Sequence, residues 1–127
     1  MLNITFPTSR DIYLEVNGKK LAVVESYKAK STCDSQYIEA FGQSEPIGTI
    51  AGRVRHTIEL SRVYACEETV NNKVNFYDLH NFNLVIVKPD RKIIYSGCEW
   101  SGINESASLN STVIENITLI AAKRMEV

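Results

Sequence analysis

The alternation of apolar and polar side chains in residues 11–16 constrains the fold more than any other feature of this sequence. In this segment, DIYLEV, an aliphatic residue stands at every second position. Successive side chains of a β-strand point to opposite faces, so this period predicts a strand with one buried face. Asn17-Gly18 follows directly, and Asn-Gly is the commonest pair at the two positive-φ positions of a type I′ turn. We therefore expect a β-hairpin over residues 11–30, with KKLAVVESYKAK providing its second strand.

Residues 49–64 form the longest segment with a strand pattern. The two faces differ in character, with Ile50, Val54, Ile58 and Leu60 on one and Arg53, Arg55, Thr57 and Glu59 on the other. A straight strand of this length would span about 50 Å, longer than strands in small domains usually are. Gly52 lies inside it and indicates a bulge or a bend. We expect the strand either to bend or to reach beyond its own subunit.

The C-terminal half has the same character. FNLVIVK and RKIIYSGCEW flank Pro89-Asp90, a pair typical of a turn, and predict a second hairpin. The closing segment, TVIENITLIAAKRM, carries apolar residues on both faces. A strand that is apolar on both faces is usually covered on both, either inside a domain or in a subunit contact.

Two segments depart from the strand pattern. Residues 31–48 contain glycine, proline and small polar residues around Tyr37, Ile38 and Phe41, and predict a long loop; loops of this length in small domains are usually functional. The loop is expected to dock either on its own domain or on a neighbour. Residues 65–80 have apolar side chains at helical spacing and early acids, which predicts one short α-helix. No linker or repeat divides the chain, so residues 1–127 are expected to form a single, mainly β domain with an arm at residues 1–10.

Residues with catalytic or metal-binding spacing are missing from this sequence. His56 and His80 are isolated from one another, and no HExxH, DxD, GxSxG or P-loop pattern occurs. Cys33, Cys66 and Cys98 are widely spaced and odd in number, which disfavours both a disulfide framework and a zinc site. We expect no catalytic residue, no metal and no cofactor, with Cys98 a core thiol rather than a nucleophile.

Charge and hydropathy narrow the class of partner. The net charge is −1 and the pI about 6.1, whereas tight nucleic-acid binding requires a basic surface that neutralises phosphates. No apolar run approaches the roughly 18 residues of a membrane span, and the N-terminus lacks the pattern of a secretory signal. We expect synthesis in the cytosol, no membrane partner, and at most a surface that nucleic acid passes without binding.

The order of these elements resembles that of the tail tube proteins of bacteriophages and phage-derived particles, especially those with contractile tails. The resemblance runs from about residue 11 to residue 122. It rests on the hairpin IYLEVNGKKLAVVESYKAK, the glycine-containing loop, the long strand TIAGRVRHTIELSRVY, the hairpin FNLVIVKPDRKIIYSGCEW and the closing SASLNSTVIENITLIA. The most suggestive stretch is the last, in which a strand with aromatic residues (YSGCEWSGI) leads through a Ser/Asn-rich crossing to ENITLIA.

The resemblance implies two packed antiparallel sheets that form a β-barrel-like sandwich with one helix. It also implies six subunits in a ring, rings stacked into a tube, and partners that include sheath, tape-measure and baseplate proteins. DNA or the tape-measure protein would pass through the lumen, and assembly would take place in the bacterial host cytoplasm. The chain is short for a major tube protein, so a tube initiator or distal tube protein of the baseplate is an alternative. A monomeric β-barrel that binds a small ligand or glycan through Tyr13, Tyr27, Tyr37, Tyr95 and Trp100 is another.

Residue roles follow as expectations. The long loop should make contacts between subunits, through Asp34, Tyr37, Ile38, Phe41, Gln43 and Glu45. The polar face of the long strand, with Arg53, Arg55 and Glu59, should line either the lumen or the outer wall. The expected core residues are Ile12, Leu14, Leu21, Val23, Ile58, Leu60, Leu84, Ile86 and Trp100.

Overall fold

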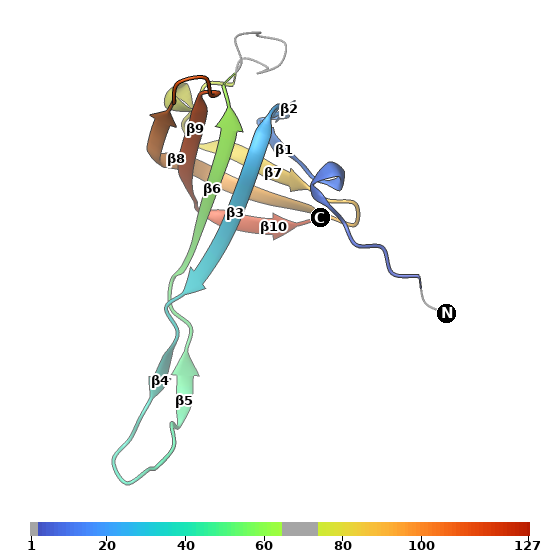
Figure 1. Cartoon of the computed structure of the whole chain (residues 1–127). Helices are drawn as coiled ribbons and strands as arrows, with labels where there is room; N and C mark the ends of the chain where they lie inside the picture. Colours follow the sequence, from blue (N-terminus) through green and yellow to red (C-terminus); the bar gives the residue numbers. More distant parts are fainter. Residues whose placement is uncertain (1–2, 65–73) are drawn as a thin grey trace.

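The computed structural model describes residues 3–64 and 74–127, which fold almost entirely into antiparallel strands (Figure 1). Two short 3-10 helices, η1 (Ser9–Asp11) and η2 (Phe76–Asp78), accompany these strands. The strands are β1 (Tyr13–Val16), β2 (Lys19–Lys20), β3 (Val24–Cys33), β4 (Gln36–Ile38), β5 (Gly48–Ile50), β6 (Val54–Val63), β7 (Phe82–Val87), β8 (Lys92–Ser106), β9 (Ile114–Ala121) and β10 (Lys123–Glu126). Among the described residues, no helix is both long and apolar enough to cross a membrane.

The first hairpin is confirmed, with one difference in its second strand. Asn17 and Gly18 have φ values of 49° and 83°, as a type I′ turn requires, and β1 pairs with β2 across them. Val23 then adopts φ 57°, which is rare for a β-branched residue. The chain leaves the hairpin at this point, so the segment expected to be one strand is divided into β2 and β3, which belong to different sheets.

Apart from β4 and β5, which pair only with each other, the strands form two sheets that share β8. Sheet A has the order β2-β1-β7-β8-β10, and sheet B the order β8-β9-β6-β3. The first part of β8 belongs to sheet A and the second part, from Glu99 to Ser106, pairs with β9 in sheet B. The two layers are thus continuous through β8, and the predicted sandwich of two antiparallel sheets is confirmed.

Gly97 is the point at which β8 passes from one sheet to the other. Its φ is 63°, and a Cβ atom on it would lie 2.9 Å from the Cβ of Ala122. Ala122 is the residue between β9 and β10, and its N–H donates to the carbonyl of Ser96 at 3.0 Å. A glycine meets both demands at once, because it accepts a positive φ and has no side chain to clash.

The core lies between the two sheets. Its fully buried side chains include Val16, Ile58, Phe76, Phe82, Leu84, Ile86, Cys98, Ile117 and Leu119. Each large aliphatic or aromatic residue buried here contributes about 1.5–3 kcal/mol. Most of the predicted core residues are buried, but Ile12 and Trp100 are only partly so, and Val23 is 44% exposed. The prediction for Val23 is wrong because its positive φ turns the side chain out of the strand pattern.

The segment expected to be an α-helix is described only in part. Residues 65–73, including Cys66, lie outside the described residues. The remainder contains η2, with the side chain of Asn75 accepting from the N–H of Tyr77 as an N-cap.

Candidate assembly surfaces

Residues 34–53 form a hairpin arm that projects from the body of the molecule (Figure 1). The prediction of a long loop over residues 31–48 is wrong at both ends of this range, because β3 continues to Cys33 and residues 36–38 and 48–50 pair as β4 and β5. Residues 39–47 connect these two strands. The predicted bend in the long strand is confirmed, since residues 51–53 separate β5 from β6. Gly52 stands at the bend, where a Cβ atom would lie 1.9 Å from the carbonyl oxygen of Asp34. The two strands of the arm cross too closely at its base for any other residue.

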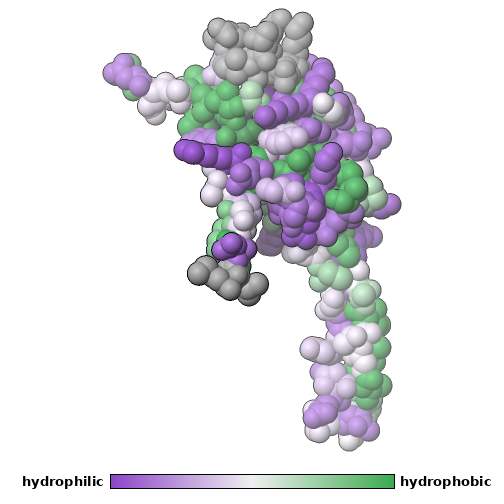
Figure 2. Space-filling view, turned by 90° about the vertical axis from the view of Figure 1, so that its right-hand side faces the viewer, coloured by the Kyte–Doolittle hydropathy of each residue, from purple (hydrophilic) through white to green (hydrophobic). Residues whose placement is uncertain are grey.

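The apolar residues of the hairpin arm stand clear of the core. Phe41 at the tip is 107% exposed, Tyr37 is 72% exposed and Ile47 is 60% exposed. All six predicted contact residues lie on this arm and are exposed: Asp34, Tyr37, Ile38, Phe41, Gln43 and Glu45. Figure 2 shows hydrophobic residues (green) along the arm where it extends away from the body. Their role in contacts remains a prediction.

The arm has little to hold it in shape by itself. Its ladder consists of three residue pairs, Gln36–Ile50, Tyr37–Thr49 and Ile38–Gly48. At its base, Asp34 forms an ion pair with Arg55 at 3.8 Å, with both side chains more than half exposed, and such pairs contribute at most about 1 kcal/mol. A two-stranded ribbon without a covered apolar face is only marginally stable in water. The contacts within the arm therefore contribute little to its stability.

The outer face of sheet B is mostly polar. His56, Ile58, Leu60 and Arg62 of β6 point inward, so Arg55, Thr57, Glu59 and Ser61 point outward. Register places Lys28 of β3 opposite Glu59, and Thr118 of β9 on the other side of Glu59. Two of the residues predicted for a lumen or outer wall, Arg55 and Glu59, lie on this face. Arg53 precedes β6 and lies at the base of the arm.

The two edges of sheet B have no strand partner among the described residues. β3 pairs with β6 on one side only, and residues 99–106 of β8 pair only with β9. The four strands alternate in direction, so the two edge strands run antiparallel to each other. Unpaired edges are templates for pairing with another chain.

One buried charged residue escaped the sequence predictions. Arg62 is 8% exposed. Its Nη2 lies 3.0 Å from Oε1 of Glu115 and donates to the carbonyl of Val74 at 2.8 Å, while its Nε donates to the same Oε1 at 3.1 Å. Its guanidinium also lies over the ring of Phe76, at 4.9 Å. Arg62 lies on the same face of β6 as Ile58 and Leu60, because the three residues are two positions apart. This spacing in the sequence was the signal that its side chain points inward.

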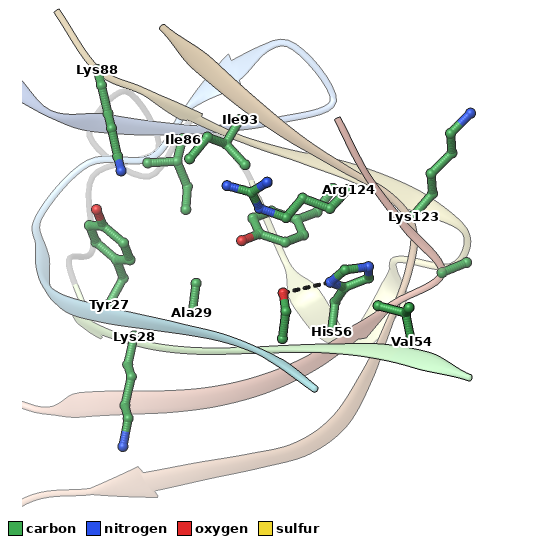
Figure 3. A pocket seen from close by; sticks show the side chains of 13 residues that line it. Tyr27, Lys28, Ala29, Val54, His56, Ile86, Lys88, Ile93, Lys123 and Arg124 are labelled. Carbon is green, nitrogen blue, oxygen red and sulfur yellow. Dashed lines mark hydrogen bonds between the residues drawn. The ribbon is translucent and has the colours of Figure 1, made fainter. Parts of the chain in front are cut away.

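The aromatic residues proposed for a ligand-binding module do not meet in one place. Tyr27 and Tyr95 line an open hollow of about 890 Å³ between the two sheets, together with His56 and Arg124 (Figure 3). Tyr37, by contrast, lies on the arm, and the ring of Trp100 packs against that of Tyr77 at 5.9 Å. The geometry therefore does not favour the binding-module hypothesis.

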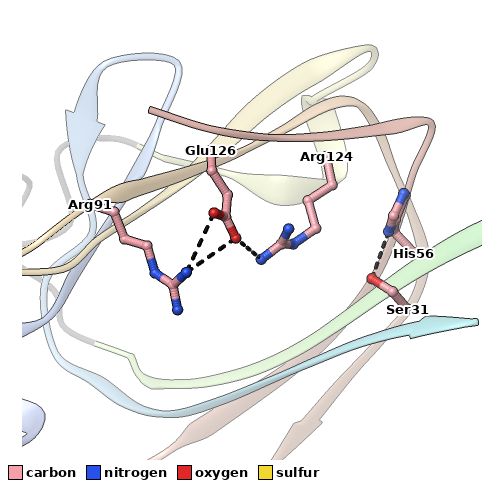
Figure 4. A network of polar contacts seen from close by, with 5 residues as sticks. All are labelled: Ser31, His56, Arg91, Arg124 and Glu126. Atoms are coloured by element: carbon pink, nitrogen blue, oxygen red, sulfur yellow. Dashed lines mark hydrogen bonds and ion pairs between the residues drawn. The ribbon is translucent and has the colours of Figure 1, made fainter.

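Polar contacts beside this hollow are local. Ser31 lies 2.7 Å from Nδ1 of His56, and Glu126 accepts from Arg124 at 2.9 Å and from Arg91 at 3.3 Å (Figure 4). The hydrogen bond from Arg124, followed by the charge of Arg91, holds the pKa of Glu126 below its usual value. Because these side chains are between 31% and 45% exposed, the ion pairs add little stability.

Cys98 does not have the environment of a nucleophile. Its side chain is buried, and burial raises the pKa of its thiol to about 11. The thiol is therefore protonated at neutral pH and donates to the carbonyl of Tyr95 at 3.3 Å. Within residues 3–64 and 74–127, no three His, Cys, Asp or Glu side chains are grouped so that they could hold a metal ion.

Comparison with known proteins shows which solved structures share this fold. No protein-family model and no curated protein sequence matches the chain. Solved structures do match over nearly its whole length. They include the tail of an empty gene transfer agent particle, refined with helical C6 symmetry (TM-score 0.72, 15% identity, 96% of this chain and 98% of that one).

Two further similar structures come from other particles. One is the sheath/tube terminator of the PVC extracellular contractile injection system in its extended state (TM-score 0.72, 14% identity, 98% of this chain and 99% of that one). The other is the SPP1 tail tube (TM-score 0.72, 9% identity, 94% of this chain and 77% of that one). At these identities the likeness concerns the fold. The chain has the tail-tube fold of phages and phage-like particles.

Proposed function

We propose that this protein is a structural subunit of a phage-like tail, in which six copies form a ring and rings stack into the inner tube. The observation that carries the proposal is the pair of edges on sheet B to which no other described strand is bonded. Because β3 and residues 99–106 of β8 run antiparallel to each other, β3 of one copy matches the β8 edge of the next. This contact is head-to-tail, and head-to-tail contacts that close by rotation form rings.

The outer face of sheet B supports a role as the wall of a conduit. Joining copies through these edges makes one continuous sheet, whose outer face carries hydroxyl, amide and charged side chains. Charges of both signs occur, as in the Lys28–Glu59 pair. A strongly basic wall would hold phosphates, whereas this mixed face suits the passage of DNA or a tape-measure protein. We infer that Arg55 and Glu59 face the lumen.

The hairpin arm supports the proposed contacts between rings. The hairpin arm extends beyond the body and carries the exposed Phe41 and Tyr37, which suits contact between stacked rings. Sheath and baseplate proteins are the further partners of this proposal. The likeness to a tube terminator favours a second candidate, a ring at one end of the tube with the same ring contacts but limited stacking.

Size-exclusion chromatography with light scattering, combined with negative-stain microscopy, tests the proposal. The purified protein should form rings of six copies, and tubes at higher concentration. A ring that never stacks supports the terminal-ring candidate. A protein that remains monomeric at millimolar concentration would contradict both.

A further inference from the structure

A groove lies at the end of the body opposite the hairpin arm. It has a volume of about 610 Å³ and runs between β1–β2 and the start of β3. Apolar side chains line it, among them Ile12, Leu21 and Val23, and two cationic residues, Arg10 and Lys20, contribute to its wall. Glu25 is the acidic residue in the same lining. Lys20 lies over the ring of Tyr13 at 4.7 Å. The lining of the groove therefore holds two cationic side chains against one carboxylate.

The tip of the hairpin arm has the opposite character. Phe41 is fully exposed there, with Glu39 and Glu45 on its two sides. Residues 35–52 contain no lysine or arginine. The tip is therefore an acidic turn with one aromatic side chain at its centre, and buried aromatic anchors surrounded by polar residues dominate the energetics of protein contacts.

We propose that the arm tip of one copy docks into this groove of a second copy in the next ring, with Phe41 in the apolar floor and Glu39 and Glu45 beside Arg10 and Lys20. This proposal rests on the proposed function and names the receiving site for stacking. The charges of the two surfaces are complementary, which gives a contact specificity and the right register. Because the groove combines an apolar floor with cations, an acidic tip with an aromatic side chain fits it better than a neutral apolar segment would.

The directions of the two surfaces agree with stacking. The groove lies at Val24, where β3 begins, and the arm leaves the body beyond Cys33, where β3 ends. Ten residues of strand separate them, about 33 Å. A tip that points away from one end and a groove that opens at the other form a head-to-tail contact, which repeats along an axis without closing.

Disulfide trapping tests the contact directly. In a background with Cys33→Ser and Cys66→Ser, Phe41→Cys is combined with Ala22→Cys, since Ala22 lines the groove. The matched control combines Phe41→Cys with Leu109→Cys. Leu109 is 92% exposed and lies in the β8–β9 connection, which the register places at the same end of the body as the start of β3.

Oxidised tubes should give a ladder of cross-linked chains when Phe41→Cys is combined with Ala22→Cys, and none with the control pair. Two results would overturn the docking proposal: tubes that form but give no ladder with Phe41→Cys and Ala22→Cys, or an equal ladder with the control pair. Neither result would contradict the proposed function as a tube subunit. If the unmodified protein forms no tubes, the proposed function fails and the docking proposal falls with it.

Charge exchange provides a second, independent test. One variant carries Glu39→Lys and Glu45→Lys, so that its tip and groove are both basic. The other carries Arg10→Glu and Lys20→Glu, so that both are acidic. Each alone should form rings but lose at least about tenfold in tube formation, because like charges meet. An equal mixture should regain tubes with alternating rings. The proposal would be contradicted if either variant alone formed as many tubes as the unmodified protein. It would also be contradicted if the mixture formed only single rings.

Discussion

At the scale of single residues, buried and strained positions hold the two sheets and the arm in their places. Arg62 joins β6 to β9 through Glu115 and to the segment at Val74 through its carbonyl. Gly97 and Gly52 allow close approaches that a Cβ atom would block. Such positions are hard to predict from sequence, because their contact partners lie far away along the chain. The partners of Arg62 are 12 and 53 positions away, and those of the two glycines are 18 or more positions away.

Replacing Arg62 by methionine tests the energetic role of this ion pair. The substitution leaves the nearly buried carboxylate of Glu115 and the carbonyl of Val74 without their partner, so the free energy of unfolding should fall by about 3 kcal/mol. Arg91→Met is the matched control, since Arg91 pairs with Glu126 on the surface, and should change it by less than about 1 kcal/mol. Urea denaturation of unassembled subunits measures both. Equal losses for the two variants would show that Arg62 has no special role.

The burial of Cys98 predicts that its thiol reacts slowly in the folded protein. A variant with Cys33→Ser and Cys66→Ser keeps Cys98 as its sole cysteine. With its pKa raised to about 11 by burial, this thiol should not react with a disulfide reagent at about pH 8 until guanidinium unfolds the chain.

The sign of the linkage follows from the same shift. Because the pKa of this thiol in the folded protein lies above its ordinary value of 9.0, the stability contributed by the protonated thiol is complete below about pH 9 and is lost as the pH rises towards about 11. Cys98→Ala should remove this alkaline loss. Rapid reaction of the folded protein at about pH 8, or an unchanged alkaline loss in Cys98→Ala, would contradict the assignment of Cys98 as a buried thiol.

At the scale of elements, the hairpin arm and the two edges of sheet B carry the assembly argument. The period-two pattern identified most strands and both hairpins. It could not place the break between β2 and β3, since nothing in KKLAVV marks Val23 for a positive φ. It also mistook the arm for a loop, because the short β4 and β5 strands have little alternation of their own.

Deleting Asp34–Gly48 and bridging the gap with two glycines tests the arm as an element. The free energy of unfolding should change by less than about 1 kcal/mol, because no side chain in this range is buried. Stacking of rings should be lost. Leu109→Ser removes an exposed apolar side chain outside the arm and should leave stacking unchanged. Normal tubes from the deletion variant, seen by negative-stain microscopy, would show that the arm is not the stacking element.

At the scale of the whole molecule, the structure has two layers of different character. Sheet A covers one side of the core, and sheet B has a polar outer face and two edges that pair with no other strand of residues 3–64 and 74–127. Sequence predicted two packed sheets through the family resemblance rather than through periodicity. Alternation shows which residues share a face, but not which strands become neighbours, because pairing depends on contacts between residues far apart in the chain. The proposal that the outer face of sheet B lines a lumen rests on the observed strand order, which alternation could not supply.

Cryo-electron microscopy of the assembled protein would show whether copies join through the edges of sheet B. We expect rings of six copies in which β3 of each subunit pairs with residues 99–106 of β8 in the next, with Arg55 and Glu59 facing the lumen. A reconstruction in which sheet A faces the lumen, or in which the edges of sheet B remain unpaired between subunits, would contradict it.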